Sequence, residues 1–211
     1  MKKTSGERTL LASVLLSAPG PLVVGIGLVA GRSSTQLADF VRRTAELAAI
    51  IVSWLMFRLL KRDNAEDKAR KAKLERTASR GVGLAMCLGG AAMALLAFLP
   101  DTGDKGNVLP GLVIALLGVV TNSWFWFRYN RLDRRDPSAI LNVQSRLYRA
   151  KTLVDLCVAA ALLSVAIFPG SSLAAYMDAA GSLVVALYLI LSGANILRGK
   201  SRNARKAEAG R

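Results

Sequence analysis

Six apolar segments, each 18 to 25 residues long, constrain the fold of this chain more than any other feature. They cover residues 9–30, 36–60, 82–99, 108–127, 146–168 and 173–197. An α-helix of about 20 apolar residues crosses the ~30 Å hydrocarbon core of a bilayer. A chain of 211 residues with 53% hydrophobic and 20% charged residues is therefore predicted to be an all-α integral membrane protein with six transmembrane helices.

The basic residues predict the orientation of these helices. Of the 29 Lys and Arg residues, 22 lie in residues 1–8, 61–80, 128–146 and 198–211. The other three links hold Arg32 and Lys105. Because cytoplasmic loops carry an excess of Lys and Arg, we expect a cell-membrane protein with both termini in the cytoplasm. A transmembrane domain, residues 1–197, would precede a basic tail, residues 198–211, that its composition predicts to be disordered.

The net charge of +15 indicates lipid rather than nucleic acid as a partner, since the basic residues lie between apolar segments. Residues 61–80, whose Ala, Lys, Arg and Glu content favours helix, and the tail should attract anionic lipid head groups. Such attraction is worth about 1 kcal/mol per basic residue near the surface. Residues 128–145 are expected to form a second basic connector.

The residue types argue against an enzyme and against a cofactor. The chain has no His, the commonest zinc ligand and the usual proton switch near neutral pH. Cys87 and Cys157 both lie in apolar segments and are expected to be small packing residues. No Ser or Cys has a base near it in the sequence, and no glycine-rich phosphate loop is present.

Three local patterns predict details of the helices. Pro19-Gly20-Pro21 should kink the first one. The aromatic run of residues 124–129 is expected to mark the headgroup level. Gly83, Cys87 and Ala91 fall at four-residue steps, which lets helices approach closely; this face favours a homodimer.

Four charged residues repeat one spacing in two of the segments. Arg42 and Glu46 lie four residues apart in the second segment, as do Lys151 and Asp155 in the fifth. Residues four apart project from the same side of a helix. A charge within a membrane helix costs about 2.5–3.5 kcal/mol on insertion scales, so such side chains usually face a protein interior or a water-filled cavity.

The register of these two segments predicts contacts between the pairs. The segments cross in opposite directions, and antiparallel residues at equal depth share one index sum. Positions 42 and 155 have the same sum as positions 46 and 151, so the ion pairs Arg42–Asp155 and Glu46–Lys151 could form together. Two interpretations stay open: an ion-binding cavity, or structural pairing that closes the centre.

With its six spans, its acid-bearing second and fifth helices and Gly31-Arg32-Ser33-Ser34 ahead of Ala38-Asp39, the chain resembles the membrane domain of the cation diffusion facilitators. In that family an Ala-Asp-x-x-[His/Asp]-x-x-x-Asp stretch on helix two meets a [His/Asp]-x-x-x-Asp pair on helix five. Together they bind a divalent transition metal, exchanged against protons. The usual cytosolic domain after helix six has no counterpart in the basic tail.

The resemblance implies that the four ligand places fall on Arg42, Glu46, Lys151 and Asp155. Two of these places are basic. A unit charge about 4 Å from another is worth ~4 kcal/mol at an effective dielectric of 20, so a divalent ion meets about twice that from each cation. We therefore expect no zinc or cadmium site and assign no metal ligand. Asp39, Asn122 and Asp178 are secondary candidates, because the resemblance implies them or because they lie near the outer helix ends. Glu75 is a further position at which the chain resembles the family.

Two functions follow as alternatives. The first is a secondary transporter of a cation or another small ion, other than zinc, with proton coupling as one option. The second is a non-transporting membrane scaffold or partner subunit whose centre is closed by the Arg42–Asp155 and Glu46–Lys151 pairs. The resemblance also implies a homodimer.

Overall fold

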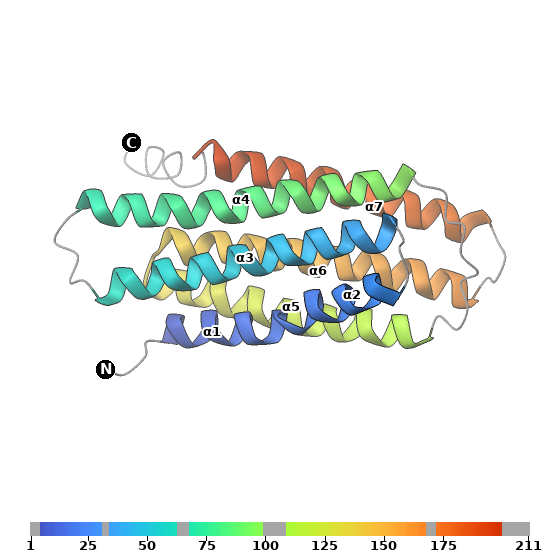
Figure 1. The fold of residues 1–211 in the computed structure, drawn as a ribbon, viewed down its shortest axis with the longest axis horizontal. Coiled ribbons are helices and arrows are strands. Elements are labelled where there is room, and N and C mark those ends of the chain that lie inside the picture. The colour runs from blue at the N-terminus through green and yellow to red at the C-terminus, as the bar shows by residue number, and fades with distance from the viewer. Residues whose placement is uncertain (1–4, 31–33, 63–67, 99–108, 168–171, 200–211) are drawn as a thin grey trace.

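The structure, a computed structural model, describes residues 5–30, 34–62, 68–98, 109–167 and 172–199, and each regular element in these ranges is an α-helix (Figure 1). The helices are α1 (Ser5–Ser17), α2 (Pro19–Ala30), α3 (Ser34–Arg62), α4 (Lys68–Phe98), α5 (Leu109–Arg135), α6 (Ala139–Ile167) and α7 (Ser172–Leu197). Since α1 and α2 share the first apolar segment, the seven helices correspond to the six predicted segments. The all-α prediction is confirmed.

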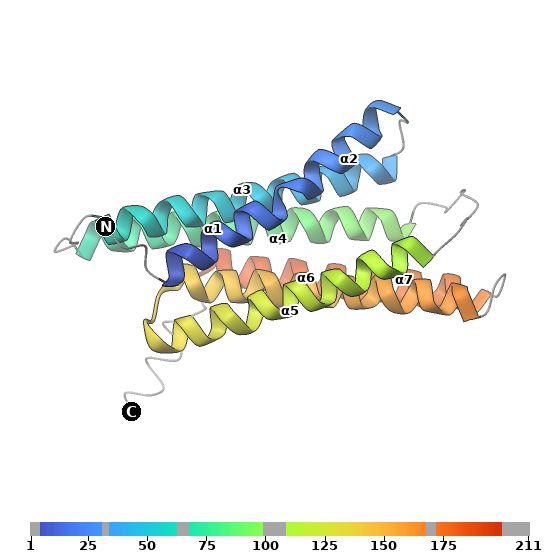
Figure 2. The same cartoon turned by 90° about the horizontal axis from the view of Figure 1, so that it is seen from below.

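The break between α1 and α2 lies at the predicted kink. The N–H of Ala18 still donates to the carbonyl of Val14 at 2.9 Å. Pro19 follows with no N–H to donate, so the chain restarts as a new helix with proline in its first position. α2 continues the oblique course of α1 with only a slight change of direction (Figure 2).

The two predicted basic connectors are mostly helical. Most of residues 61–80 belongs to the first half of α4, and α5 and α6 meet within residues 128–145, with three residues between them. One side chain near the end of α5 links it to the start of α6 across this turn. The carboxylate of Asp133 accepts a hydrogen bond from the Ser138 N–H at 3.0 Å and another from Asn142 Nδ2 at 3.0 Å.

The long helices lie side by side along the longest axis of the molecule, with α4 against α7, α5 against α6, and α3 against α4 (Figures 1 and 2). α1 begins and α7 ends at the same end of this bundle (Figure 1), as an even number of crossings requires. We call it the terminal end. At α7, Gly199 has a φ of 68°, the left-handed conformation in which glycine commonly ends a helix.

The aromatic run of residues 124–129 divides between the surface and the core. Trp124 is 56% and Phe127 is 62% exposed, whereas Phe125 and Tyr129 are buried. Neighbouring positions on a helix point about 100° apart, so a continuous run cannot present every ring to lipid. The expected headgroup belt therefore fits the two exposed rings and is corrected for Phe125 and Tyr129, which belong to the core.

The small residues of α4 pack against α7 within the same chain. A Cβ added to Gly193 would lie 2.6 Å from the Gly83 carbonyl oxygen and 2.7 Å from the Cys87 sulfur, and one added to Gly90 would lie 2.8 Å from the Ala186 carbonyl oxygen. At Gly90 and Gly193 the contact leaves no room for even a methyl group. The predicted close approach is thus an intrachain one, and it no longer supports a homodimer.

Apolar side chains also cover the outside of the bundle. Leu22, Ile114 and Val120 are 67%, 69% and 68% exposed, as expected where lipid replaces water. Among the described residues, two helical segments, Ala69–Leu95 and Leu112–Arg135, are each long and apolar enough to cross a membrane, and Leu183–Leu197 is a shorter apolar one.

Candidate functional site

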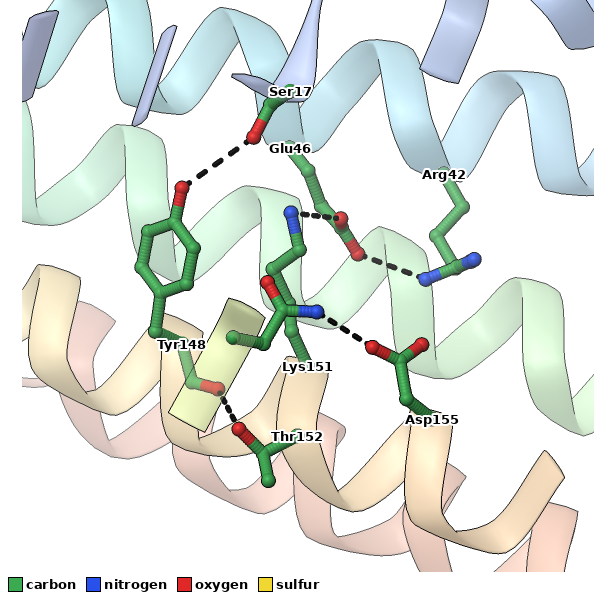
Figure 3. Close-up of polar contacts among 8 residues, drawn as sticks. Ser17, Arg42, Glu46, Tyr148, Lys151, Thr152 and Asp155 are labelled. Carbon is green, nitrogen blue, oxygen red and sulfur yellow. Dashed lines mark hydrogen bonds and ion pairs between the residues drawn. The ribbon is translucent and has the colours of Figure 1, made fainter. Parts of the chain in front are cut away.

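A cavity of about 470 Å³ lies between α1–α2, α3, α5 and α6. Arg42 and Glu46 reach it from α3, and Lys151 and Asp155 reach it from α6 (Figure 3). The structure thus brings together the four residues that the i, i+4 spacing singled out. We call this space the central cavity.

Glu46 is the centre of the charged network. Its side chain is 8% exposed, and each oxygen faces one cation: Arg42 Nη1 lies 3.1 Å from Oε1, and Lys151 Nζ lies 3.4 Å from Oε2 (Figure 3). The ammonium of Lys151 also lies 5.1 Å from the centre of the Tyr148 ring. The Glu46–Lys151 contact is the one expected from the antiparallel register, whereas Arg42–Glu46 is a contact within one helix.

Asp155 is held by a different partner. Asn122 Nδ2, from α5, donates a hydrogen bond of 2.6 Å to Asp155 Oδ2. Gly118, one turn away on α5, makes room for this carboxylate, because a Cβ there would lie 2.5 Å from the same oxygen. Arg42 and Asp155 point toward one another across the cavity (Figure 3), and the positive charge of Arg42 acts on the carboxylate. The Arg42–Asp155 ion pair itself stays a prediction.

A layer of buried rings and hydroxyls lies beside the cavity, toward the terminal end. Phe125, Tyr129 and Tyr148 are 0–1% exposed, and their ring centres are 4.9–6.1 Å apart. The Tyr129 hydroxyl is 2.7 Å from the Ser13 hydroxyl, and the Tyr148 hydroxyl is 3.4 Å from that of Ser17. Phe125, Tyr148 and Ser17 also line the cavity. We call the group of three rings and their two serine partners the aromatic layer. It borders the cavity on that side.

Sequence reasoning missed several residues that line the cavity: Ser17, Gly118, Thr121 and Tyr148. Gly118 and Asn122 repeat the i, i+4 spacing of the charged pairs. This spacing was a usable signal that a third helix, α5, lines the cavity. Asn122, a secondary candidate, proves to touch Asp155 directly.

Other secondary candidates lie elsewhere. The side chains of Asp39 and Asp178 fall outside the part of the chain that the structure describes, and Glu75 lines a different pocket.

The donor set does not suit zinc. Within the described ranges, no three or more His, Cys, Asp or Glu side chains gather closely enough to hold a metal ion. Zinc prefers nitrogen and sulfur ligands in a tetrahedral arrangement. The cavity instead offers the carboxylates of Glu46 and Asp155, each already in contact with a cation or an amide donor. The arrangement can bind a cation only if an internal positive charge moves away.

Residues 10–202 match a protein-family model described as the cation efflux transmembrane domain. This chain belongs to the cation efflux family. The match spans all seven helices apart from the first residues of α1, which confirms the resemblance seen in the sequence. No curated protein matches the chain.

Membership in the cation efflux family supports the coarse functional predictions. A transmembrane protein and a role in cation transport are both supported by it. The motif positions that the family resemblance assigned to its helices two and five fall on α3 and α6, which line the central cavity. The family thus gives the class of protein, and the cavity gives the place where the four charged residues meet.

Proposed function

We propose that this cation efflux protein is a secondary transporter that carries a cation or another small ion, other than zinc, through the central cavity. Glu46 and Asp155 would be the acidic groups that bind it. One observation carries this proposal: two carboxylates from two different helices line a cavity of about 470 Å³. Secondary transporters bind their substrates near the membrane midplane, between helix groups that rock against one another.

In this proposal Arg42 and Lys151 are internal counter-ions. Each faces one oxygen of Glu46, so an incoming cation must displace at least one of them. Lys151 is the more easily displaced, because a lysine ammonium is a compact charge on a flexible stem, whereas a guanidinium is a rigid planar group. Exchange against protons is one way to drive transport. If the substrate has an anionic group, the same two cations would contact it directly.

The chemistry of the donors supports the exclusion of zinc. The chain contains no His, and the two carboxylates are supplemented in the cavity by the amide of Asn122 and the hydroxyl of Thr121. Oxygen ligands of this kind suit hard cations such as magnesium or manganese, whereas imidazole and thiolate suit zinc.

The proposal also covers the protein's setting. The distribution of Lys and Arg supports a cell-membrane location with both termini in the cytoplasm. Family membership is compatible with a homodimer. Residues 61–80 and the tail of residues 198–211 are expected to contact anionic lipids.

A non-transporting scaffold is the second candidate, and one contact favours it. Both oxygens of Glu46 already face cations of the same chain, so the centre could serve as a permanent clasp between α3 and α6. Removing one member of a buried ion pair lowers the free energy of unfolding by about 3–5 kcal/mol, because the other charge is left uncompensated.

Flux through proteoliposomes tests the transporter proposal. The purified chain is reconstituted, and the movement of protons, of magnesium and manganese, and of small organic cations is followed separately. We expect flux of at least one of these ions, and its loss in Glu46→Gln and Asp155→Asn. Asp136→Asn is the matched control, because this acid forms an exposed pair with Lys61 at 2.9 Å, far from the cavity. An absence of all flux in the wild-type protein would contradict the proposal.

A further inference from the structure

A second pocket, of about 430 Å³, lies between α4, α6 and α7 near the terminal end. Its lining includes Arg76 and Arg80 from α4 and Arg198, directly after α7. Asn142 and Val143 line it from α6. We call it the arginine pocket. It shares no lining residue with the central cavity.

The three arginines are available to a ligand. Arg76, Arg80 and Arg198 are all exposed, and none of them forms an ion pair within the ranges that the structure describes. Glu75 is the acid of the described lining, so the arginines outnumber it three to one. The neighbouring Ser79 hydroxyl is already used, since it donates to the Glu75 carbonyl oxygen at 2.8 Å. The pocket therefore carries an uncompensated positive charge.

The pocket lies where two helices change from apolar to basic. On α4, Arg80 precedes the apolar stretch, and on α7 the apolar stretch ends at Leu197. Ile196 and Val143, 4% and 3% exposed, form an apolar wall. Leu84, one turn beyond Arg80 on the same side of α4, is 54% exposed. A ligand at this place meets positive charge at one end and exposed apolar surface at the other.

We propose that the arginine pocket binds the phosphate group of an anionic phospholipid, with the acyl chains lying along the apolar side of α4. Arginine binds phosphate oxygens through pairs of charge-assisted hydrogen bonds. Basic pockets between membrane helices on the cytoplasmic side bind anionic lipid head groups. The net positive lining selects an anionic lipid over a zwitterionic one. The site is independent of transport through the central cavity.

Lipid binding to the purified full-length chain tests this site. Delipidated protein in detergent is titrated with phosphatidylglycerol, with phosphatidylcholine of the same acyl chains, and with inorganic phosphate, and bound lipid is counted by native mass spectrometry. We expect one phosphatidylglycerol per chain to bind in preference to phosphatidylcholine. Arg76→Gln/Arg80→Gln should weaken that binding at least about tenfold, given the contribution of each basic residue near a membrane surface.

Two exposed lysines on the same helix give the matched control. Lys71 and Lys73 are not in the pocket lining, and Lys71→Gln/Lys73→Gln removes the same charge from α4. An equal loss in this control would mean diffuse attraction and would overturn the site. Binding of inorganic phosphate as tight as that of the lipid would overturn the lipid as the ligand. If the arginine double variant fails to fold, Arg198→Gln is measured in its place, and unchanged lipid affinity there would equally overturn the proposal.

Discussion

Two helix contacts of this protein are built in opposite ways. α4 and α7 meet through glycines: the backbone of Gly193 is so close to Gly83 and Cys87 that even a methyl group has no room. α3 and α6 meet across the central cavity through charged side chains, with Lys151 Nζ 3.4 Å from Glu46 Oε2. The first contact is a close approach of backbones at glycines, and the second is made by the ends of long charged side chains.

The difference indicates which part of the molecule can move. Backbones in close contact gain many small attractions that a slight separation removes, so α4 and α7 should move as one unit. A contact made by long charged side chains can be remade at several separations. Rocking of helix groups around a central site would therefore open the α3–α6 contact and leave the α4–α7 contact unchanged.

The largest effect is expected at the charged contact. Glu46→Ala should abolish flux and change stability little, because the two cations that are left line a cavity of about 470 Å³, which has room for water. Flux and thermal unfolding are measured on Glu46→Ala, Lys151→Ala and the double variant. If the centre is instead a closed clasp, Glu46→Ala should cost about 3–5 kcal/mol, and the double variant should recover much of it. Recovery of stability in the double variant would contradict the proposal that the α3–α6 contact opens during transport.

The second prediction addresses the glycine contact. Gly193→Ala should destabilise the protein by about 1–3 kcal/mol, the range for an overpacked interior, because the new methyl group meets the Gly83 carbonyl and the Cys87 sulfur. Thermal unfolding in detergent gives the size of the effect. The remaining folded protein should transport at the wild-type rate.

Gly81→Ala is the matched control for Gly193→Ala. A Cβ at Gly81 would lie 3.9 Å from Val52 Cγ1, an ordinary contact, so the substitution should be neutral or stabilising through higher helix propensity. Equal losses in both variants would mean that the cost comes from the backbone and not from the α4–α7 contact.

These two contacts also show how far the sequence could predict the site. Arg42, Glu46, Lys151 and Asp155 were found because a four-residue spacing and an antiparallel register fix which side chains share a face and a depth. The contact between α4 and α7 was predicted as a small-residue face, but its partner was not, since a glycine stripe carries no information about the helix it meets.

The rest of the site depends on tertiary packing. The hydrogen bond from Asn122 to Asp155 requires the rotation and depth of α5 relative to α6, which no single segment encodes. The burial of Phe125 and Tyr129 likewise follows from which side of α5 faces α6 and α1. The pattern of the aromatic run alone was compatible with a membrane interface.

The third prediction tests the room that α5 leaves for Asp155. Gly118→Ala places a methyl group 2.5 Å from Asp155 Oδ2, so the carboxylate must turn and lose its 2.6 Å bond to Asn122. Stability should change little, because alanine favours helix by up to about 1 kcal/mol and a carboxylate moves easily. Flux should fall several-fold. Asn122→Ala removes the same bond without crowding, and an unchanged flux in both variants would exclude this bond from the transport cycle.

The smallest effect is expected in the aromatic layer. Here a hydroxyl that is buried away from the cavity, that of Tyr129, can be compared with one beside the cavity, that of Tyr148. Tyr129→Phe removes a hydroxyl that is fully buried and 2.7 Å from the Ser13 hydroxyl, and a net hydrogen bond is worth about 0.5–1.5 kcal/mol. Tyr148→Phe removes a hydroxyl whose contact to Ser17, at 3.4 Å, lies beside the cavity. It should cost less than Tyr129→Phe, since water in the cavity can replace the lost partner. Thermal unfolding of the two variants gives the order, and a larger cost for Tyr148→Phe would mean that the cavity is closed to water on this side.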